Sequence, residues 1–191
     1  VVVAEGFAPE AVERLGARWK NVRLLEAGEL RRTNRSEILY RSIPGGLLAQ
    51  EQDRHLPSSA DFRHVAGPAP DESMSRDAEL LSVVAKHLKS NAVCIGRDGA
   101  LLGAGAGQMD RVAACRNAIT KSGDRLGPGT GVPVAASDAF FPFADGPEML
   151  MDAGVRCLIH PGGSKRDEET FELCNKRGIT CLLTGVRHFR H

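Results

Sequence analysis

A glycine-rich run, Gly103-Ala-Gly-Ala-Gly107-Gln108, and the nearby Arg111 are the first residues whose spacing suggests ligand binding. The dinucleotide-binding fingerprint needs glycine at its sixth position, which is Gln108 here, and it should follow a first strand. We therefore expect no dinucleotide site, and the glycines would instead let backbone or a ligand approach closely. Arg111 could share an anion with free N–H groups at a helix start, or it could be an ordinary exposed arginine.

Aromatic residues are concentrated in Ser137-Asp-Ala-Phe-Phe-Pro-Phe143, which holds three of the seven phenylalanines. Pro142 prevents regular strand pairing in this segment. Core packing would explain one or two of these rings. Three of them on an irregular segment after Asp138 favour a wall for a flat ligand.

Two further segments could bind an anion or move a proton. His160-Pro-Gly-Gly-Ser164 leads from a strand into a helix. Ser164 could cap that helix with Asp167 three residues on, or the glycine N–H groups could bind a carboxylate or phosphate. The chain ends Arg187-His-Phe-Arg-His191 beside a strand end, where α/β sheets place their sites, and His191 suits proton handling. These residue types predict a domain that binds a flat, anionic ligand.

Alternating strand-like and helix-like segments predict the frame that must position these residues. Periodicity and turn signals indicate helices over 9–17, 77–89, 110–121, 147–153 and 165–177, the last ended by Gly178. Strands are expected at 1–4, 22–25, 37–41, 156–160 and 179–183, with a hairpin over 91–105 around Asp98-Gly99. Residues 51–71 and 122–134 are expected to be connections. The predicted fold class is α/β, a sandwich with a mixed sheet.

The composition excludes several classes of protein. The chain has 191 residues, 42% hydrophobic and 26% charged, which is typical of a globular protein that buries a core. A net charge of +1 argues against nucleic acid and anionic membranes as partners, and no apolar run approaches the length of a membrane span. Five cysteines without a Cys-x-x-Cys argue against a disulfide scaffold and a zinc ribbon, and they suggest a reducing, cytoplasmic setting.

Four stretches, taken in order and spacing, resemble one enzyme family. They are Lys89-Ser-Asn91-Ala-Val, Gly105-Ala-Gly-Gln-Met-Asp-Arg111, Ser137–Asp145 with Pro161–Ser164, and Arg187–His191, and Gly45–Asp53 resembles the bacterial members. The family is the bifunctional purine-biosynthesis enzyme that combines aminoimidazole carboxamide ribonucleotide (AICAR) transformylase with inosine monophosphate (IMP) cyclohydrolase. The resemblance covers nearly all of the chain.

The resemblance implies a fold, an activity and partners. It implies subdomains of the cytidine deaminase type, an α/β/α sandwich, with the end of the first subdomain and a connection in residues 1–72 and the second subdomain in residues 73–191. It implies a homodimer that transfers a formyl group from the cosubstrate 10-formyltetrahydrofolate to AICAR. No zinc is expected, because the deaminase His-x-Glu and Pro-Cys-x-x-Cys signatures are missing.

Site residues follow from the resemblance position by position. Asn91 and Arg111 match residues that hold the AICAR base and assist at the reacting centre, and His191 matches a terminal histidine near the transferred formyl group. Phe140 matches a ring packed on AICAR, and Arg187 matches a contact to its phosphate. The positions that match the folate wall are Val112, Pro142, Phe143 and Gly146, where Gly146 replaces an asparagine of some members.

Several departures from the family pattern limit what we expect of this chain. Some members hold potassium near positions that match Ser90 and Asp138, but Leu88 and Ala92 replace two of the hydroxyls there, which argues against potassium. The family's essential Lys-His pair and its IMP cyclohydrolase domain lie upstream of Val1, whose strand-like start suggests a chain cut from a longer protein. A short edge strand at a true N-terminus is the alternative. We therefore expect no formyl transfer by the chain alone, and the alternatives are one piece of a split enzyme or a non-catalytic nucleotide-binding module.

Overall fold

The computed structural model describes residues 1–29 and 38–190, and the chain divides into two compact units, Val1–Gln52 and Asp53–His191. In the first unit, β1 (Val2–Ala4) pairs in parallel with β2 (Leu24–Glu26), and the helix α1 (Pro9–Arg18) connects them. The strands β3 (Ile38–Ile43) and β4 (Gly46–Glu51) form an antiparallel hairpin. None of the described residues in this unit is buried, so the unit has no hydrophobic core of its own.

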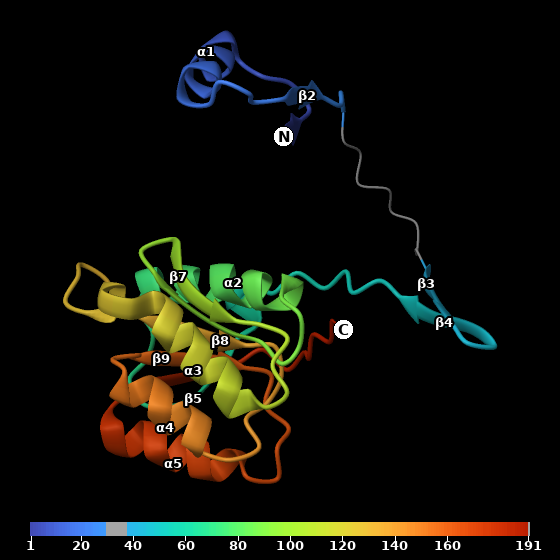
Figure 1. The fold of residues 1–191 in the computed structure, drawn as a ribbon. Coiled ribbons are helices and arrows are strands. Elements are labelled where there is room, and N and C mark those ends of the chain that lie inside the picture. Colours follow the sequence, from blue (N-terminus) through green and yellow to red (C-terminus); the bar gives the residue numbers. More distant parts are fainter. Residues whose placement is uncertain (30–37, 191) are drawn as a thin grey trace. The chain divides into compact units, whose positions relative to one another are not determined.

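The second unit is built on one six-stranded mixed sheet in the order β5-β10-β9-β8-β6-β7 (Figure 1). Its strands are β5 (Arg63–Ala66), β6 (Val93–Arg97), β7 (Ala100–Gly105), β8 (Val134–Ser137), β9 (Cys157–His160) and β10 (Thr180–Leu183). The central strands β8, β9 and β10 are parallel, whereas β6 runs antiparallel to β8, and β5 runs antiparallel to β10. The mixed sheet expected from the sequence is thereby confirmed.

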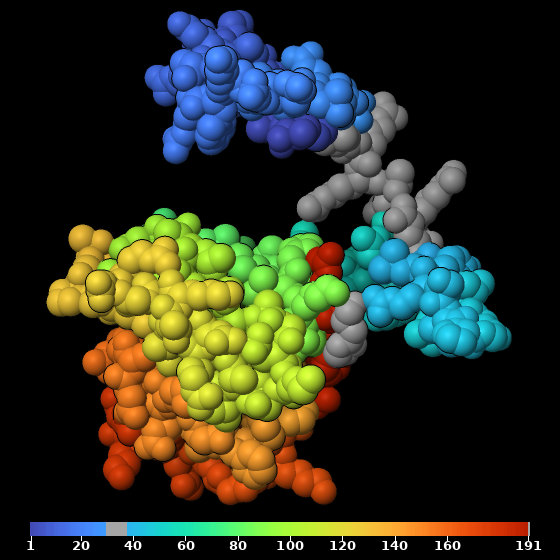
Figure 2. Space-filling model, viewed as in Figure 1, coloured from blue at the N-terminus to red at the C-terminus, as the bar shows by residue number. Residues whose placement is uncertain are grey.

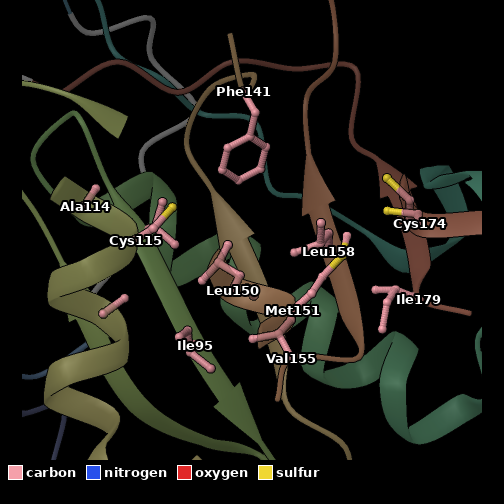
Figure 3. Packing of buried hydrophobic residues seen from close by; sticks show 14 of the residues in the cluster. Ile95, Ala114, Cys115, Phe141, Leu150, Met151, Val155, Leu158, Cys174 and Ile179 are labelled. Atoms are coloured by element: carbon pink, nitrogen blue, oxygen red, sulfur yellow. The ribbon is translucent and has the colours of Figure 1, made fainter. Parts of the chain in front are cut away.

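Helices cover both faces of this sheet and bury alternate residues of its strands. The helix α2 (Glu72–His87) packs on one face against a cluster that includes Cys94, Val134 and Leu182. The opposite face carries α3 (Arg111–Ser122), α4 (Asp145–Asp152) and α5 (Asp167–Arg177), and its cluster includes Ile95, Leu158 and Ile179 (Figure 3). Because successive side chains of a strand point to opposite faces of the sheet, each central strand contributes side chains to the hydrophobic clusters on both faces. The predicted α/β/α sandwich is confirmed.

Local sequence signals account for most of the predicted helix ends and for the hairpin turn. Asp71 and Asp110 cap α2 and α3 by accepting hydrogen bonds from backbone N–H groups of the first turn. Asp98 and Gly99 have φ of 53° and 72°, which gives the predicted hairpin turn between β6 and β7. Gly178, with φ of 64°, ends α5 in the left-handed conformation, as expected.

The glycine-rich run has a packing role. A Cβ on Gly103 would lie 2.3 Å from the carbonyl oxygen of Ala118, and one on Gly105 would lie 2.1 Å from that of Ala114. Only glycine therefore allows α3 to pack this closely across β7. Of the two uses considered for these glycines, close approach of backbone explains Gly103 and Gly105.

Four expectations about the elements differ from the structure. The hairpin strand β4, the edge strand β5 and the buried strand β8 are additional, and α2 begins at Glu72 instead of residue 77. The strand β5 lies inside the stretch expected to be a connection, where its exposed polar residues conceal it. Strand β8, Val-Ala-Ala-Ser, is buried on both faces and therefore lacks the alternation that identifies a strand.

Candidate functional site

One edge of the six-stranded sheet brings together the segments singled out in the sequence. The parallel strands β8, β9 and β10 end there, so the segments after Ser137, His160 and Leu183 all leave the sheet at this edge. Strand β6 begins at the same edge, because Val93 pairs with Ser137 in antiparallel register. The sheet topology thus positions four loops that are far apart in the sequence.

Asn91, Arg111 and Asp138 form a buried polar cluster at this edge. The Arg111 guanidinium is only 7% exposed, and its Nη1 is paired with Oδ1 of Asp138, whose side chain is 1% exposed. Nη1 also donates to the carbonyl of Ala92 at 3.0 Å, and Nη2 donates to Oδ1 of Asn91 at 2.9 Å. The guanidinium therefore makes internal contacts with three residues, and neither an anion site nor an exposed arginine, the two interpretations of the sequence, describes it.

Asn91 is held in a single orientation by this cluster. Its Oδ1 accepts from Arg111, and its Nδ2 donates to the carbonyl of Gln108 at 2.9 Å. The backbone of Asn91 exchanges two further hydrogen bonds with Gln108, at 3.2 and 3.3 Å. The loop after the glycine-rich run therefore fixes the amide of Asn91 at the start of β6.

Asp138 retains one oxygen without a partner. Its Oδ1 also accepts from the N–H of Ala92 at 3.1 Å, whereas Oδ2 is buried and has no hydrogen-bond partner among the described residues. The Ser90 hydroxyl, the other expected potassium ligand, already accepts from the N–H of Arg190. A cation bound by a protein needs several oxygen ligands at once. The described residues leave one buried carboxylate oxygen without a partner here, and the expectation that potassium is not bound stays a prediction.

The three phenylalanines of the Ser137–Phe143 segment separate into two roles. Phe141 is buried in the core, with its ring edge-on to His160 at an interplanar angle of 70° and a centroid distance of 5.4 Å. Phe140 is half-buried, and the Arg187 guanidinium lies 4.6 Å from its ring centroid. Phe143 is exposed and lies 4.7 Å from the Arg166 guanidinium. Two of the rings therefore lie at the surface of the site, each beside a cation.

Arg187 is exposed and weakly held. Among the described residues it contacts the Phe140 ring and donates one hydrogen bond, from Nη2 to the carbonyl of Gly163 at 3.4 Å. Gly163 belongs to the loop after β9, while Arg187 follows β10. The resemblance assigns Phe140 and Arg187 to the same ligand, and the structure brings these two side chains together.

The glycine turn after β9 is closed by the chain's own carboxylate. Asp167 Oδ2 accepts from the N–H groups of Gly163 at 2.7 Å and Ser164 at 3.2 Å. Regular α5 begins at Asp167, with Arg166 as its N-cap residue. The reciprocal hydrogen bonds expected between Ser164 and Asp167 are nevertheless present, because the Ser164 hydroxyl also accepts from the N–H of Arg166 at 3.1 Å. The anion expected at this turn is therefore the Asp167 side chain.

His160, at the end of β9, is a core histidine. It is fully buried, and its Nδ1 accepts from the N–H of Gly162 at 3.1 Å. Its pKa is lowered from 6.5 to about 4, mainly by burial; the charge of Asp167 opposes this shift and the charge of Arg111 adds to it. His160 is therefore neutral at pH 7.

The remaining predicted site residues either lie around the same edge or are not among the described residues. Val112 is half-buried in the first turn of α3, and Pro142 is exposed. Gly146 is buried in α4, and a Cβ there would lie 3.3 Å from Cys115 Sγ and Phe141 Cδ1, so it contributes to core packing. His191 lies outside the described residues.

Asp53, Lys86 and His188 form a second polar cluster, which the sequence pattern does not reveal. His188 Nδ1 lies 2.5 Å from Asp53 Oδ2, and Lys86 Nζ lies 3.6 Å from Asp53 Oδ1. His188 and Lys86 are buried, with side chains 5% and 7% exposed. The three residues are separated by 33 and 102 positions in the chain, and no spacing motif connects them.

Two hollows are lined by residues outside the predicted site. One, of about 350 Å³, is lined by Ser73, Arg76, Asp77, Asp98 and Gly99, at the turn end of the β6–β7 hairpin. The other, of about 390 Å³, lies between β5 and α5. Neither contains a predicted site residue. Among the described residues there is no group of three or more His, Cys, Asp or Glu arranged to hold a metal ion, and no helix is long and apolar enough to cross a membrane.

The fold and this edge define an α/β/α domain with aromatic rings, guanidinium groups and a buried Asn–Arg–Asp cluster where its strands end. A family model described as the AICARFT/IMPCHase bienzyme matches residues 1–121. The bifunctional purine biosynthesis protein PurH of Bradyrhizobium diazoefficiens is 41% identical over 197 aligned positions, which cover 100% of this chain and 37% of that protein. PurH of Streptococcus suis is also 41% identical, over 192 positions that cover 100% of this chain and 36% of that protein.

The chain therefore belongs to the AICARFT/IMPCHase bienzyme family, and the resemblance found in the sequence is confirmed. It spans a little over a third of the length of these curated relatives.

Proposed function

We propose that this chain is the C-terminal portion of an AICAR transformylase and forms part of its AICAR and folate sites in purine biosynthesis. The observation that carries the proposal is the meeting of Asn91, Phe140 and Arg187 at one edge of the sheet. These residues come from three segments that are each family-like in sequence.

AICAR has a flat base and a phosphate, and Phe140 and Arg187 supply a partner for each. The base stacks on the Phe140 ring, and the Arg187 guanidinium receives the phosphate through two parallel N–H bonds. Arg187 lies over that ring in the free chain. Because it is exposed and has a single 3.4 Å hydrogen bond, moving it aside for the base costs little.

Formyl transfer joins the amine nitrogen of AICAR to the formyl carbon and breaks the bond between that carbon and N10 of the folate. One proton leaves the amine, and one arrives at N10. An aromatic amine is a weak nucleophile, so proximity, a proton route and a donor to the developing oxyanion must supply the rate. Asn91 holds its amide in a fixed orientation at the sheet edge, and Arg111 acts through Asn91 by donating to its Oδ1. In this proposal His191 handles the proton, and Val112, Pro142 and Phe143 border the folate.

A non-catalytic nucleotide-binding module is the second candidate, and the burial of Arg111 favours it. All the contacts described for this guanidinium are internal, so it is not free to meet a substrate without breaking the pair with Asp138. In that case AICAR binds through Phe140 and Arg187 alone, and no transfer follows.

Calorimetric titration with AICAR tests the proposal, first with the chain alone and then with the upstream transformylase segment of a relative added. We expect saturable binding that weakens in Arg187→Lys and is much weaker for the AICAR nucleoside, which lacks the phosphate. Arg156→Lys is the control, since Arg156 is exposed before β9, at the opposite end of the strands. Formyl transfer in the mixed sample distinguishes the enzyme from the binding module. Absence of AICAR binding in both samples refutes the proposal.

The partners and location of the chain belong to the same proposal. The family resemblance implies a homodimer, and the exposed apolar side chains of the β3–β4 hairpin, among them Leu39, Tyr40 and Leu47, are suited to an interface. All five cysteines are free and buried, which suits a reducing cytoplasm.

A further inference from the structure

The C-terminal segment after β10 is bound to the sheet edge by backbone hydrogen bonds. The N–H of His188 donates to the carbonyl of Asp138 at 2.9 Å. Ser90 and Arg190 exchange two more bonds, from Ser90 N to the Arg190 carbonyl at 2.8 Å and from Arg190 N to the Ser90 hydroxyl at 3.2 Å. In Figure 2 the C-terminal residues, in red, lie against the green segment of the same unit. The segment is therefore ordered along the residues that flank Asn91 and Asp138.

The side chain of His188 is anchored from the opposite end of the unit's sequence. Its Nδ1 lies 2.5 Å from Asp53 Oδ2, although 135 positions separate the two residues. Lys86 adds a second contact, with Nζ 3.6 Å from Asp53 Oδ1 and 2.5 Å from the carbonyl of His55. Partial burial raises the pKa of the Asp53 carboxyl, but the hydrogen bond and charge of His188 and the charge of Lys86 outweigh it, so its pKa is lowered. Asp53 is therefore an ionised partner for His188 near neutral pH.

We propose that Asp53 and His188 are a positioning pair that holds the C-terminal segment in register, so that Arg187 stays beside Phe140 and Arg190 stays beside Ser90. Only the part of this inference that concerns AICAR binding rests on the proposed function. Neither residue touches the predicted ligand, and neither belongs to the Asn91–Arg111–Asp138 cluster. Their effect on binding is transmitted through the backbone between residues 187 and 190.

Geometry explains why this pair, more than the other contacts, would set the register. Arg187, Phe189 and Arg190 are exposed, whereas His188 is 5% exposed and is the one described residue after Arg187 that is buried. A short segment with a single buried side chain is fixed at that side chain and can slide when it is released. The ring of His188 also stacks on His55 at a centroid distance of 6.1 Å, so the residues just after Asp53 help to enclose it.

Hydrogen exchange in the whole 191-residue chain tests the anchoring without any ligand. The reporters are the backbone amides of Ser90, His188 and Arg190, which donate across the contact. In Asp53→Ala we expect all three to exchange at least about tenfold faster, with the amide of Gln108 unchanged because it bonds to Asn91. Asp53→Glu, which restores a carboxylate, should slow the three amides again. Asp61→Ala removes an exposed aspartate nearby in sequence and is the matched control.

Ligand binding tests the positioning. In Asp53→Ala and in His188→Ala, AICAR should bind about 10- to 100-fold more weakly, by analogy with the loss of outer-shell partners in metal sites. The double variant should bind no more weakly than either single variant, because one contact is being removed twice. Folate affinity should stay within error of the Asp61→Ala control.

Each other outcome contradicts a defined part of the account. Unchanged exchange at Ser90, His188 and Arg190 in Asp53→Ala overturns the anchoring. Faster exchange with unchanged AICAR affinity overturns the positioning role and leaves only a tail contact. If the unmodified chain binds no AICAR with or without the upstream segment, the proposed function fails, and the exchange measurement still decides whether the pair holds the segment.

Discussion

Replacing Arg111 with methionine should destabilise the chain strongly, because it leaves a charge buried without its partner. Methionine keeps the apolar stem of the side chain but removes the guanidinium. Among the described residues, Asp138, 1% exposed, then retains only the N–H of Ala92 as a donor, at 3.1 Å, and Asn91 loses the donor to its Oδ1.

The expected cost is large relative to the stability of an ordinary domain. Breaking a buried ion pair by removing one partner costs about 3–5 kcal/mol, out of about 5–15 kcal/mol for the unfolding of a typical domain. Adding Asp138→Asn removes the buried charge, while the amide oxygen can still accept from Ala92. We therefore expect the double variant to recover at least about 2 kcal/mol relative to Arg111→Met alone.

Urea unfolding of the four chains of this cycle, followed by circular dichroism, measures these differences. Arg116→Met is the control, because Arg116 is exposed on the same helix, and it should change the free energy of unfolding by less than about 0.5 kcal/mol. A loss below about 1 kcal/mol in Arg111→Met, or a double variant less stable than that single variant, would refute the description of a buried, charged cluster.

Three further predictions concern ligand binding, pH and assembly. Arg187→Lys should weaken AICAR binding by about 1.5–3 kcal/mol and leave folate binding near normal, because lysine cannot copy a two-bond phosphate contact; equal effects on the two dissociation constants would exclude the assigned role. Burial lowers the pKa of His160 to about 4 in the folded chain, against 6.5 in the unfolded chain, so the unfolded chain binds more protons between these two values. The free energy of unfolding should therefore decrease as the pH is lowered through that window. The difference in the free energy of unfolding between pH 7 and pH 5 should be about 2 kcal/mol smaller in His160→Gln than in the unmodified chain, and His87→Gln should show no such change. Light scattering at tens of micromolar should show a dimer or concentration-dependent association through the exposed residues of Val1–Gln52, and a strictly monomeric mass would count against it.

Much of the fold could be predicted because its signals are local. The Asp98-Gly99 turn, the aspartate before α3 and the glycine after α5 each act through their own backbone, so the hairpin and the helix ends follow from the sequence. Strands β5 and β8 could not be predicted in this way. One is an exposed edge strand and the other is buried on both faces, and neither shows the alternation of a half-buried strand.

The candidate site was predicted as a set of segments but not as a set of contacts. Family-like motifs identified Asn91, Phe140 and Arg187, and parallel strand ends explain why these residues meet. The internal pairing of Arg111 with Asp138 and the additional bond from the Gly163 N–H to Asp167 were not predicted. Each depends on which loops the sheet order makes neighbours, and that order is set by packing over long sequence distances.

We expect the edge where β8, β9 and β10 end to bind AICAR through Phe140 and Arg187. The most direct test is a nuclear magnetic resonance titration of the isotope-labelled chain with AICAR, together with its upstream partner segment if the chain alone does not respond. The account predicts saturable shifts at Asn91, Phe140, Gly163 and Arg187, and none at the distant Asp98-Gly99 turn. Saturable shifts confined to other parts of the chain, or no shifts in either sample, would contradict it.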